Sequence, residues 1–439
     1  MYLVAKGPLS YRKTPVGVFL LTGDKGRIEI DDTVVTVLGL CDGRHTPDEV
    51  VLAALGEDAS ASDKATLDAL FQSMEAEGVI VRESAPRPVE PFYRKDRPLA
   101  MMVEITYACN EACLYCLRPT GKKMSGELEN SVFLDLAEEA ASLGVSPVNI
   151  TGGEPLLKAD LALEMSRRLH GAGCHVHLLT NGLLVTPALA RELHDAGVES
   201  AQVSLDSANP ETHDRLRGQA GAHARALQGI ADLRGAGIVV NTATVVNRHN
   251  WEERHEVWAL VRKVADWCKL SAQLPIGRGR NADLLSVKED VDLHLMLMRD
   301  QDGRLRSAFI PRDRCSIGTS PVMAPDGTIY PCMLSRYEGL ELGRYPQDSL
   351  SGIWKHSPLL ADLRSLNVNE LDRCRECEGR YFCGGGCRAS AYASTGSYRG
   401  RDPVRCPINK VLFRALLREG DEVSLALARR CLDAAAQPE

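Results

Sequence analysis

The chain has 439 residues, of which 44% are hydrophobic, 25% charged and 5% aromatic, a composition typical of a folded globular protein of about three domains. This composition excludes fibrous, collagenous and disordered proteins. No apolar run reaches the ~20 residues of a membrane span and no secretory signal opens the chain, so we expect a cytoplasmic protein with no membrane partner. A net charge of −7 offers no attraction to a polyanion, and we expect no nucleic acid partner.

Residues 1–90 are expected to form a separate small domain. The proline-rich stretch 84–97 disfavours both helix and central strand, and we place a linker at 91–98. Residues 1–90 contain nine Lys and Arg against fifteen Asp and Glu. Because phosphate would repel so acidic a domain, DNA binding is disfavoured.

The elements predicted in this domain form a small winged helix-turn-helix. Two short β-rich segments flank Lys25 and Gly26 as a hairpin, and apolar residues at helical spacing predict three helices. Thr46, with Glu49 three residues later, predicts a capping box at the start of the second helix. The segments are strands 17–24 and 27–32 and helices 33–41, 46–55 and 65–78.

From Leu99 to Asp290, short β-rich runs alternate with helical runs, which predicts parallel βαβ units. Six strands are too few for a closed eight-stranded barrel, so we expect an α/β fold with an open, partial (β/α)6 TIM-like barrel at 99–290. A C-terminal cysteine-rich domain at 291–439 should end in a helix near 411–432. The predicted strands are 101–107, 147–151, 175–180, 199–205, 237–246 and 270–276, and the helices are 131–144, 161–173, 187–197, 224–237 and 251–267.

The 14 cysteines are unevenly distributed. Disulfides are rare in a reducing cytosol, so clustered cysteines there indicate metal binding or chemistry. Three lie within residues 109–116 and seven within residues 315–406. The remaining four are expected to be small buried apolar residues: Cys41, Cys174, Cys268 and Cys431.

The first cluster has the spacing CxxxCxxC, formed by Cys109, Cys113 and Cys116 after the first predicted barrel strand. Three thiolates can hold three irons of a [4Fe-4S] cluster and leave the fourth iron open for a ligand. The C-terminal ends of barrel strands are where active sites of such folds gather. Taken alone, the three cysteines are equally compatible with a structural zinc site.

The segments that follow favour the iron–sulfur interpretation. The cysteine motif, Gly152-Gly153-Glu154-Pro155, Thr180-Asn181-Gly182 and the run 203–207 stand in order at successive strand ends. Together they resemble the radical S-adenosylmethionine (SAM) enzymes over nearly all of residues 99–290. The resemblance implies reductive cleavage of SAM to methionine and a 5′-deoxyadenosyl radical, which abstracts a substrate hydrogen.

The same resemblance implies roles for individual residues. Residues 152–154 would contact the methionine part of the cofactor, since glycines let a ligand approach the backbone. Ser204 and Arg217 would contact the ribose and carboxylate, while Tyr115 and Gly277 would lie at the adenine. The implied cofactor-binding residues are Tyr115, Gly152, Gly153, Glu154, Ser204, Arg217 and Gly277, and the implied catalytic cysteines are Cys109, Cys113 and Cys116.

The second cysteine group resembles the SPASM extension of radical enzymes, which carries auxiliary iron–sulfur clusters. Four of its cysteines would suit a zinc ribbon if they stood alone. The resemblance implies three [4Fe-4S] clusters in all, with an outer auxiliary cluster on Cys374, Cys377, Cys383 and Cys406 and an inner one on Cys315, Cys332 and Cys387. Relatives have one more cysteine just before the first, where this chain has Ser307-Ala-Phe-Ile-Pro311. A distant residue, such as Cys268, would complete the inner cluster, or one iron stays open for substrate.

One departure from this group narrows the function. Its sulfatase-maturating members have a catalytic aspartate directly after the second auxiliary cysteine, where this chain has Met333. Asp326, in Pro-Asp-Gly, is predicted to be a turn residue rather than a base. Sulfatase maturation is therefore disfavoured.

The N-terminal pattern at 38–51 and 77–80 resembles the precursor-peptide recognition element of ribosomal peptide biosynthesis. Such a domain offers an edge strand to which an extended leader peptide can add. We therefore expect a radical SAM maturase that forms a thioether or carbon–carbon crosslink in a leader-bound peptide, with an external electron donor such as flavodoxin or ferredoxin. Two alternatives remain: a radical dehydrogenase or epimerase of a small molecule, and an iron–sulfur winged-helix regulator.

Overall fold

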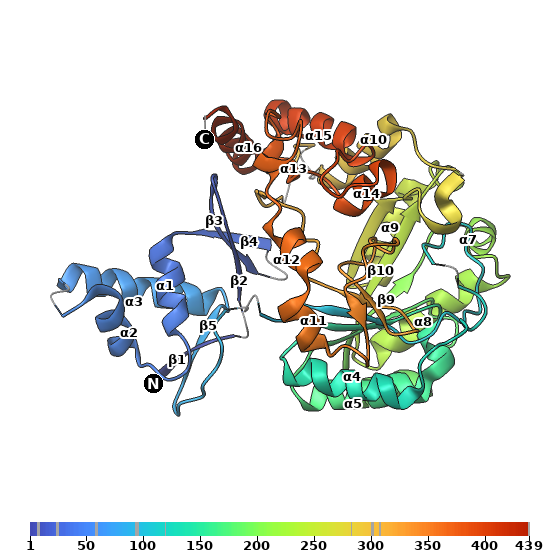
Figure 1. Cartoon of the computed structure of the whole chain (residues 1–439), viewed down its shortest axis with the longest axis horizontal. Helices are drawn as coiled ribbons and strands as arrows, with labels where there is room; N and C mark the ends of the chain where they lie inside the picture. The colour runs from blue at the N-terminus through green and yellow to red at the C-terminus, as the bar shows by residue number, and fades with distance from the viewer. Residues whose placement is uncertain are drawn as a thin grey trace.

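The computed structural model describes residues 1–437 except 7–8, 23–25, 58–59, 93–95, 119, 282, 300–302 and 307–308. Figure 1 shows the N-terminal elements on one side of the molecule, a large sheet with helices along its outer face on the other, and the C-terminal helices above both. Among the described residues, no helix is long and apolar enough to cross a membrane.

The described residues of the N-terminal domain form three helices and two small sheets. One sheet pairs two strands antiparallel, and the other is a three-stranded meander in the order β2-β3-β4. The strands are β1 (Tyr2–Ala5), β2 (Ser10–Thr14), β3 (Gly17–Thr22), β4 (Gly26–Ile30) and β5 (Ile80–Glu83), and the helices are α1 (Asp32–Leu40), α2 (Pro47–Leu55) and α3 (Ala61–Ala76). The β3–β4 hairpin and the three helices are as predicted, although Lys25 lies outside the described residues.

Local signals explain why these helices form. At the start of α2, Glu49 N donates to Thr46 Oγ1 at 3.4 Å and Thr46 N donates to Glu49 Oε2 at 2.8 Å, which confirms the predicted capping box. Leu38 and Phe71 are completely buried in the core that the helices share with β1 and β5. The polar strand β2 was not predicted, because its sequence lacks an apolar alternation.

The N-terminal domain packs against the C-terminal helices of the chain. Phe19 of β3 belongs to the same buried cluster as Phe413 and Leu416 of α15 (Arg405–Glu419). Arg430 of α16 (Glu422–Ala436) donates to both carboxylate oxygens of Glu29 in β4, at 2.8 and 2.6 Å. The meander is therefore fixed to the end of the chain.

The described part of the linker also follows the N-terminal domain. Val89 N donates to Asp42 O at 2.8 Å, and the Phe92 ring packs edge-on against Tyr11 with 5.1 Å between centroids. Residues 93–95 of the predicted linker 91–98 lie outside the described residues.

The central sheet has nine strands in the order β11-β10-β9-β8-β7-β6-β12-β13-β14. Its first six strands are mutually parallel and open at β11, as predicted. They are β6 (Met101–Glu104), β7 (Val148–Thr151), β8 (Val176–Thr180), β9 (Val198–Ser204), β10 (Val239–Val246) and β11 (Trp267–Ala272). The connecting helices are α4 (Asn130–Ser142), η1 (Pro155–Lys158), α5 (Ala159–Gly171), α6 (Pro187–Asp195), α7 (Pro210–Arg217), α8 (Ala222–Gly235) and α9 (Arg254–Val264).

Three short strands from the cysteine-rich region extend this sheet and make it mixed. β12 lies parallel to β6, and β13 and β14 follow antiparallel. They are β12 (Val322–Met323), β13 (Thr328–Tyr330) and β14 (Gly343–Arg344). The remaining elements are η2 (Gly277–Asn281), α10 (Val287–Met298), α11 (Leu350–His356), α12 (Pro358–Ser365), η3 (Val368–Glu370), α13 (Arg380–Cys383) and α14 (Arg388–Thr395).

Several predicted limits differ from the structure, and three of the differences have a clear cause. The last parallel strand begins earlier, at Trp267, because residues 267–272 pair with 241–246 of β10. Residue 290, where we placed the domain boundary, lies inside α10, which packs in the C-terminal core through Val291. The helix predicted near 411–432 is two helices, because Asp421 caps α16 by accepting from Ser424 N at 2.8 Å.

Candidate active site and metal centres

Cys109, Cys113 and Cys116 lie in the loop between β6 and α4, at the C-terminal end of the parallel strands. Cys109 N donates to Gly121 O at 3.1 Å, and Gly121 N donates to Tyr107 O at 3.0 Å. The loop therefore folds back on itself and presents its thiols over the strand ends. This is the position that the sequence predicted for them.

Arg278 of η2 fixes this loop to the end of the sheet. Its Nε donates to Cys113 O at 2.7 Å, its Nη1 to Thr120 O at 2.9 Å and its backbone N to Cys116 O at 2.9 Å. A Cβ on the preceding Gly277 would lie 2.2 Å from Cys116 O, and φ there is +63°. Glycine is thus required at 277 by the approach of the cysteine loop itself.

The two glycines at 152 and 153 have a similar reason. A Cβ on Gly152 would lie 2.3 Å from Thr106 O, and one on Gly153 would lie 2.2 Å from Ala108 O. Gly153 N donates to Thr106 O at 2.7 Å, and Glu154 N donates to Ala108 O at 2.8 Å. We expected these glycines to give room for a ligand; the structure shows that the cysteine loop already needs that room.

Glu154 is completely buried at the end of β7. Its carboxylate accepts from Thr180 Oγ1 at 2.8 Å, from Asn181 N at 2.8 Å and from Leu156 N at 3.0 Å. Burial raises its pKa to about 7, against these hydrogen bonds. The Glu154 carboxylate therefore joins the ends of β7 and β8, while Asn181 Nδ2 continues the network to Asn110 Oδ1 at 2.7 Å.

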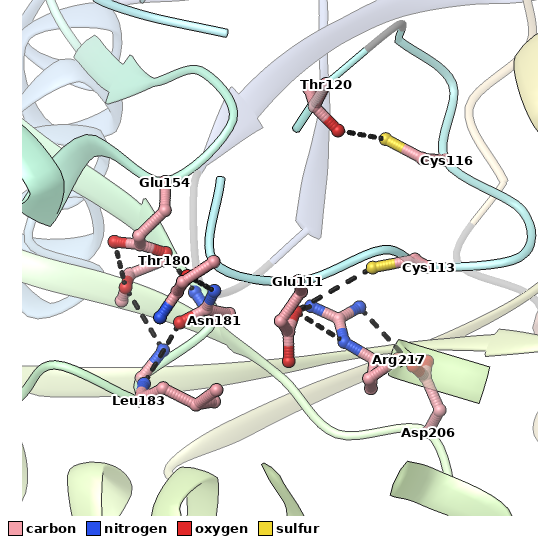
Figure 2. Close-up of polar contacts among 12 residues, drawn as sticks. Glu111, Cys113, Cys116, Thr120, Glu154, Thr180, Asn181, Leu183, Asp206 and Arg217 are labelled. Atoms are coloured by element: carbon pink, nitrogen blue, oxygen red, sulfur yellow. Dashed lines mark hydrogen bonds and ion pairs between the residues drawn. The ribbon is translucent and has the colours of Figure 1, made fainter. Parts of the chain in front are cut away.

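Arg217, the last residue of α7, lies between two carboxylates (Figure 2). Its Nη2 is 2.6 Å from Glu111 Oε2, and its Nη1 is 3.4 Å from Asp206 Oδ2. Nη1 also donates to Tyr115 OH at 2.9 Å, and that hydroxyl donates to Asp206. The network joins the cysteine loop to the end of β9, where Ser204 is half-buried.

The first thiols are strongly desolvated. Burial raises the pKa of Cys113 to about 12 and that of Cys109 to about 11. Thiols of this kind ionise when a metal supplies positive charge. Glu111 Oε1 is buried with no hydrogen-bond partner among the described residues, so the site contains a polar atom suited to a bound group.

The outer auxiliary cysteines line one cavity of about 120 Å³, several times the space that one water molecule needs. Asn409 Nδ2 donates to Cys383 Sγ at 3.1 Å, and Arg401 Nε donates to Cys406 Sγ at 3.2 Å. No three His, Cys, Asp or Glu of the described chain are placed to share one metal ion. A cavity of this size fits an iron–sulfur cluster. Its cysteines are Cys374, Cys377, Cys383 and Cys406.

The inner auxiliary cysteines also lie near one another. Burial, together with the nearby thiols of Cys315 and Cys332, raises the pKa of Cys387 to about 11. Cys387 N donates to Asp402 Oδ2 at 2.7 Å, and the same buried carboxylate accepts from Arg405 N at 3.1 Å. Asp402 thus connects the inner group to the loop that carries Cys406.

Three of the four scattered cysteines are buried as predicted, while Cys268 is half-buried. Cys41, Cys174 and Cys431 are buried in three separate apolar cores. Cys268 lies at the N-terminal end of β11 and packs on the core of the main sheet.

Asp326 is the predicted turn residue. Its Oδ1 accepts from Thr328 N at 3.0 Å, and its Oδ2 is 3.2 Å from Arg344 Nη2. The sequence did not predict roles for Glu111, Asp402 and Arg278, although Arg278 stands next to the predicted adenine contact. Their roles depend on contacts with distant segments, which no local pattern shows.

Two family models match the chain. The model of the radical SAM superfamily matches residues 103–261, and that of the SPASM iron–sulfur cluster-binding domain matches residues 315–378. The PqqA peptide cyclase of Ruegeria pomeroyi is 30% identical over 361 residues, which span 76% of this chain and 95% of the relative. This chain belongs to the radical SAM superfamily. Membership of this superfamily supports the use of SAM and iron–sulfur clusters, which the cysteine spacing predicted.

Other relatives have names that refer to different reactions. The mycofactocin maturase of Mycolicibacterium smegmatis is 30% identical, covering 73% of this chain and 86% of the relative. The AdoMet-dependent heme synthase of Methanosarcina barkeri is 30% identical, covering 70% and 95%. Identity alone therefore does not separate peptide from small-molecule substrates.

Among solved structures, SuiB of Streptococcus suis bound to S-adenosylmethionine has the same fold. The match has a TM-score of 0.63 at 15% identity and covers 91% of this chain and 99% of SuiB. A second SuiB structure, bound to the precursor peptide SuiA, matches at a TM-score of 0.63 and 14% identity, covering 92% and 99%. Since residues 1–90 are about a fifth of the chain, such coverage includes part of the N-terminal domain.

Proposed function

We propose that this chain is a radical SAM peptide maturase that forms an oxidative thioether or carbon–carbon crosslink in a leader-bound precursor. The observation that carries the proposal is the division of ten cysteines into one three-thiol loop at the strand ends and two further groups that the same chain holds nearby. Its peptide-named relatives and the peptide-bound SuiB structure support the substrate class.

In this proposal Cys109, Cys113 and Cys116 hold the first [4Fe-4S] cluster and leave one iron for SAM. With both bound, the site supplies a carbon-centred radical that removes a hydrogen atom from the substrate. Arg278 would hold the cysteine loop in place through its hydrogen bonds to the carbonyls of Cys113 and Thr120. Glu154 is completely buried, so bulk water does not reach this end of β7. The proposed SAM contacts are Tyr115, Gly152, Gly153, Glu154, Ser204, Arg217 and Gly277.

A crosslink requires the loss of two hydrogens, so after the first hydrogen atom has been abstracted an electron and a proton must also leave the substrate. The auxiliary cysteines would hold the groups that accept it, giving three [4Fe-4S] clusters per chain. The metal ligands proposed there are Cys315, Cys332, Cys374, Cys377, Cys383, Cys387 and Cys406. An external flavodoxin or ferredoxin would supply the electron that starts each turnover, in the cytoplasm.

Residues 1–90 would bind the leader as a winged-helix peptide-recognition domain. The linker at 91–98, the radical domain from residue 99 and the auxiliary domain would follow, with the boundary between the last two moved ahead of α10, which packs in the C-terminal core. Support comes from β4, which has no strand partner beyond β3 in the described chain and so leaves a sheet edge for β-addition. Holding the leader there would raise the concentration of the attached core peptide at the radical site.

The alternative is a radical dehydrogenase or epimerase of a small molecule, which the likeness to the heme synthase keeps open. The two functions differ in their substrate. The test is to incubate the reduced, reconstituted chain with SAM and the short peptide encoded beside its gene, and to measure peptide mass and 5′-deoxyadenosine. We expect a peptide lighter by two hydrogens.

The matched control replaces Cys109, Cys113 and Cys116 by Ala together. This variant should retain the auxiliary iron but make neither deoxyadenosine nor modified peptide. Normal deoxyadenosine formation by the variant would contradict the assignment of the first cluster. An unmodified peptide with a wild-type enzyme that cleaves SAM would favour a small-molecule substrate.

A further inference from the structure

A cavity of about 530 Å³ lies between the end of the parallel sheet and the auxiliary cysteine loops. One wall is the segment after β11, including Leu274 and Ile276, and the other includes Tyr337 and Tyr392, whose ring centroids are 5.8 Å apart. Of the three inner auxiliary cysteines, only Cys387 lines it. The cavity is therefore separate from the space that those three thiols enclose.

The cavity lies next to both the radical site and the inner auxiliary group. Arg280 lines it and belongs to η2, in which Arg278 bonds the carbonyls of Cys113 and Cys116. On the opposite wall lies Cys387, which the proposed function makes an inner auxiliary ligand. A substrate group in this cavity would thus lie between the source of the radical and an electron acceptor.

The charge of the cavity is one-sided. Its lining contains Arg280 and Arg405 but no Asp or Glu among the described residues. Arg405 is 3.7 Å from Asp290 Oδ1, which is itself 3.0 Å from His294 Nδ1. Arg280 has no acidic partner within the described chain. Arg280 is exposed and Arg405 is half-buried. A guanidinium that lines a cavity without a carboxylate partner favours an anionic ligand, because charge-assisted hydrogen bonds are the strong ones.

We propose that this cavity receives the core segment of the peptide substrate, and that Arg280 binds an acidic side chain of that segment. The aromatic walls would hold the flanking apolar part of the segment, because tyrosine rings give apolar area with little loss of conformational freedom. This inference rests on the proposed maturase function and adds the chemical class of the residue that enters.

The test uses the precursor that the wild-type chain modifies in the assay above. Arg280→Met should raise the KM for this precursor roughly ten- to hundredfold, the loss expected for a charge-assisted hydrogen bond. Arg280→Lys should restore part of it. Arg167→Met, at an exposed position of α5, is the matched control and should leave KM unchanged.

A second arm changes each acidic core residue of the precursor to its amide. One such change should raise the wild-type KM to a similar extent and add nothing further in Arg280→Met. Deoxyadenosine formed by the Arg280→Met variant in the absence of peptide shows whether its radical site is intact. Three outcomes would overturn the inference while the maturase function stands. Arg280→Met could raise the KM equally for acidic and amide precursors, it could leave the KM unchanged, or the core could contain no acidic residue. A wild-type chain that modifies no peptide would overturn both.

Discussion

His213, in α7, shows how one buried side chain makes the site sensitive to acid. It is completely buried, and its Nδ1 accepts a hydrogen bond from Asp206 N at 3.1 Å. Burial lowers its pKa to about 4, from an ordinary 6.5. Between pH 6.5 and 4 the unfolded chain takes up a proton that the folded chain refuses, so folding stability falls as the pH falls through this window.

We predict that His213→Gln flattens this dependence. The wild-type apoprotein should lose up to about 3 kcal/mol more than the variant between pH 7 and 4.5, because a proton held only by the unfolded chain costs ~1.4 kcal/mol of folding stability for each step of one in pH. Urea unfolding at the two pH values measures the difference, with the exposed His194→Gln as control. Parallel losses in wild type and His213→Gln would contradict the assigned protonation.

At this scale the sequence predicted how the cysteines group, because their spacing is set within short loops, while their roles as cluster ligands stay a prediction. The reason for the glycines was only partly foreseen: Gly153 gives room to the carbonyl of Ala108 rather than to a ligand alone. Arg278 could not be assigned, since its partner Cys113 stands 165 residues earlier in the chain. Such contacts exist only after the βαβ units have assembled.

Among the elements, the loop around α13 carries most of the outer auxiliary group. We predict that Cys374→Ala with Cys377→Ala removes one cluster's iron and leaves SAM cleavage intact, because hydrogen abstraction needs only the first cysteine loop. Crosslinked product should fall below a tenth of the wild-type amount, since the second electron loses its acceptor. Iron analysis, deoxyadenosine assay and peptide mass measure the three effects. Native product yield without that cluster would show that the outer group is structural.

The edge strand β4 provides a second prediction at this scale. If the leader adds to this edge, amide hydrogen exchange in Gly26–Ile30 should slow when the full precursor is added, because new strand pairing protects backbone N–H groups. A core peptide without its leader is the control and should leave these amides unchanged. Protection confined to other regions would rule out binding at β4.

Within the parallel sheet the elements were mostly predictable, because apolar periodicity indicated the six strands and five of the connecting helices. The short strands and helices of the cysteine-rich region were not predicted. Two further differences have physical causes. The polar β2 forms because it pairs with β3 along Ser10–Thr14, a tertiary effect. The break between α15 and α16 comes from the Asp421 cap, which the spacing of apolar residues alone does not predict.

At the scale of the whole molecule, the N-terminal domain is part of one packed assembly. Phe19 lies in the C-terminal core, and Arg430 bonds Glu29 across the interface. Removing residues 1–90 would expose this core, so experiments on leader binding require the full chain. This interface joins the proposed leader site to the domain that holds the auxiliary cysteines.

The central claim is that the radical formed at Cys109, Cys113 and Cys116 takes its hydrogen from a peptide held by the same chain. The most direct measurement uses a precursor deuterated in its core residues and follows deuterium by mass spectrometry. The account predicts that deuterium appears in 5′-deoxyadenosine in proportion to crosslinked peptide, and that a core-deuterated peptide without its leader gives far less. The account would be contradicted if crosslinked peptide formed while deoxyadenosine stayed unlabelled, whichever core position carried the deuterium.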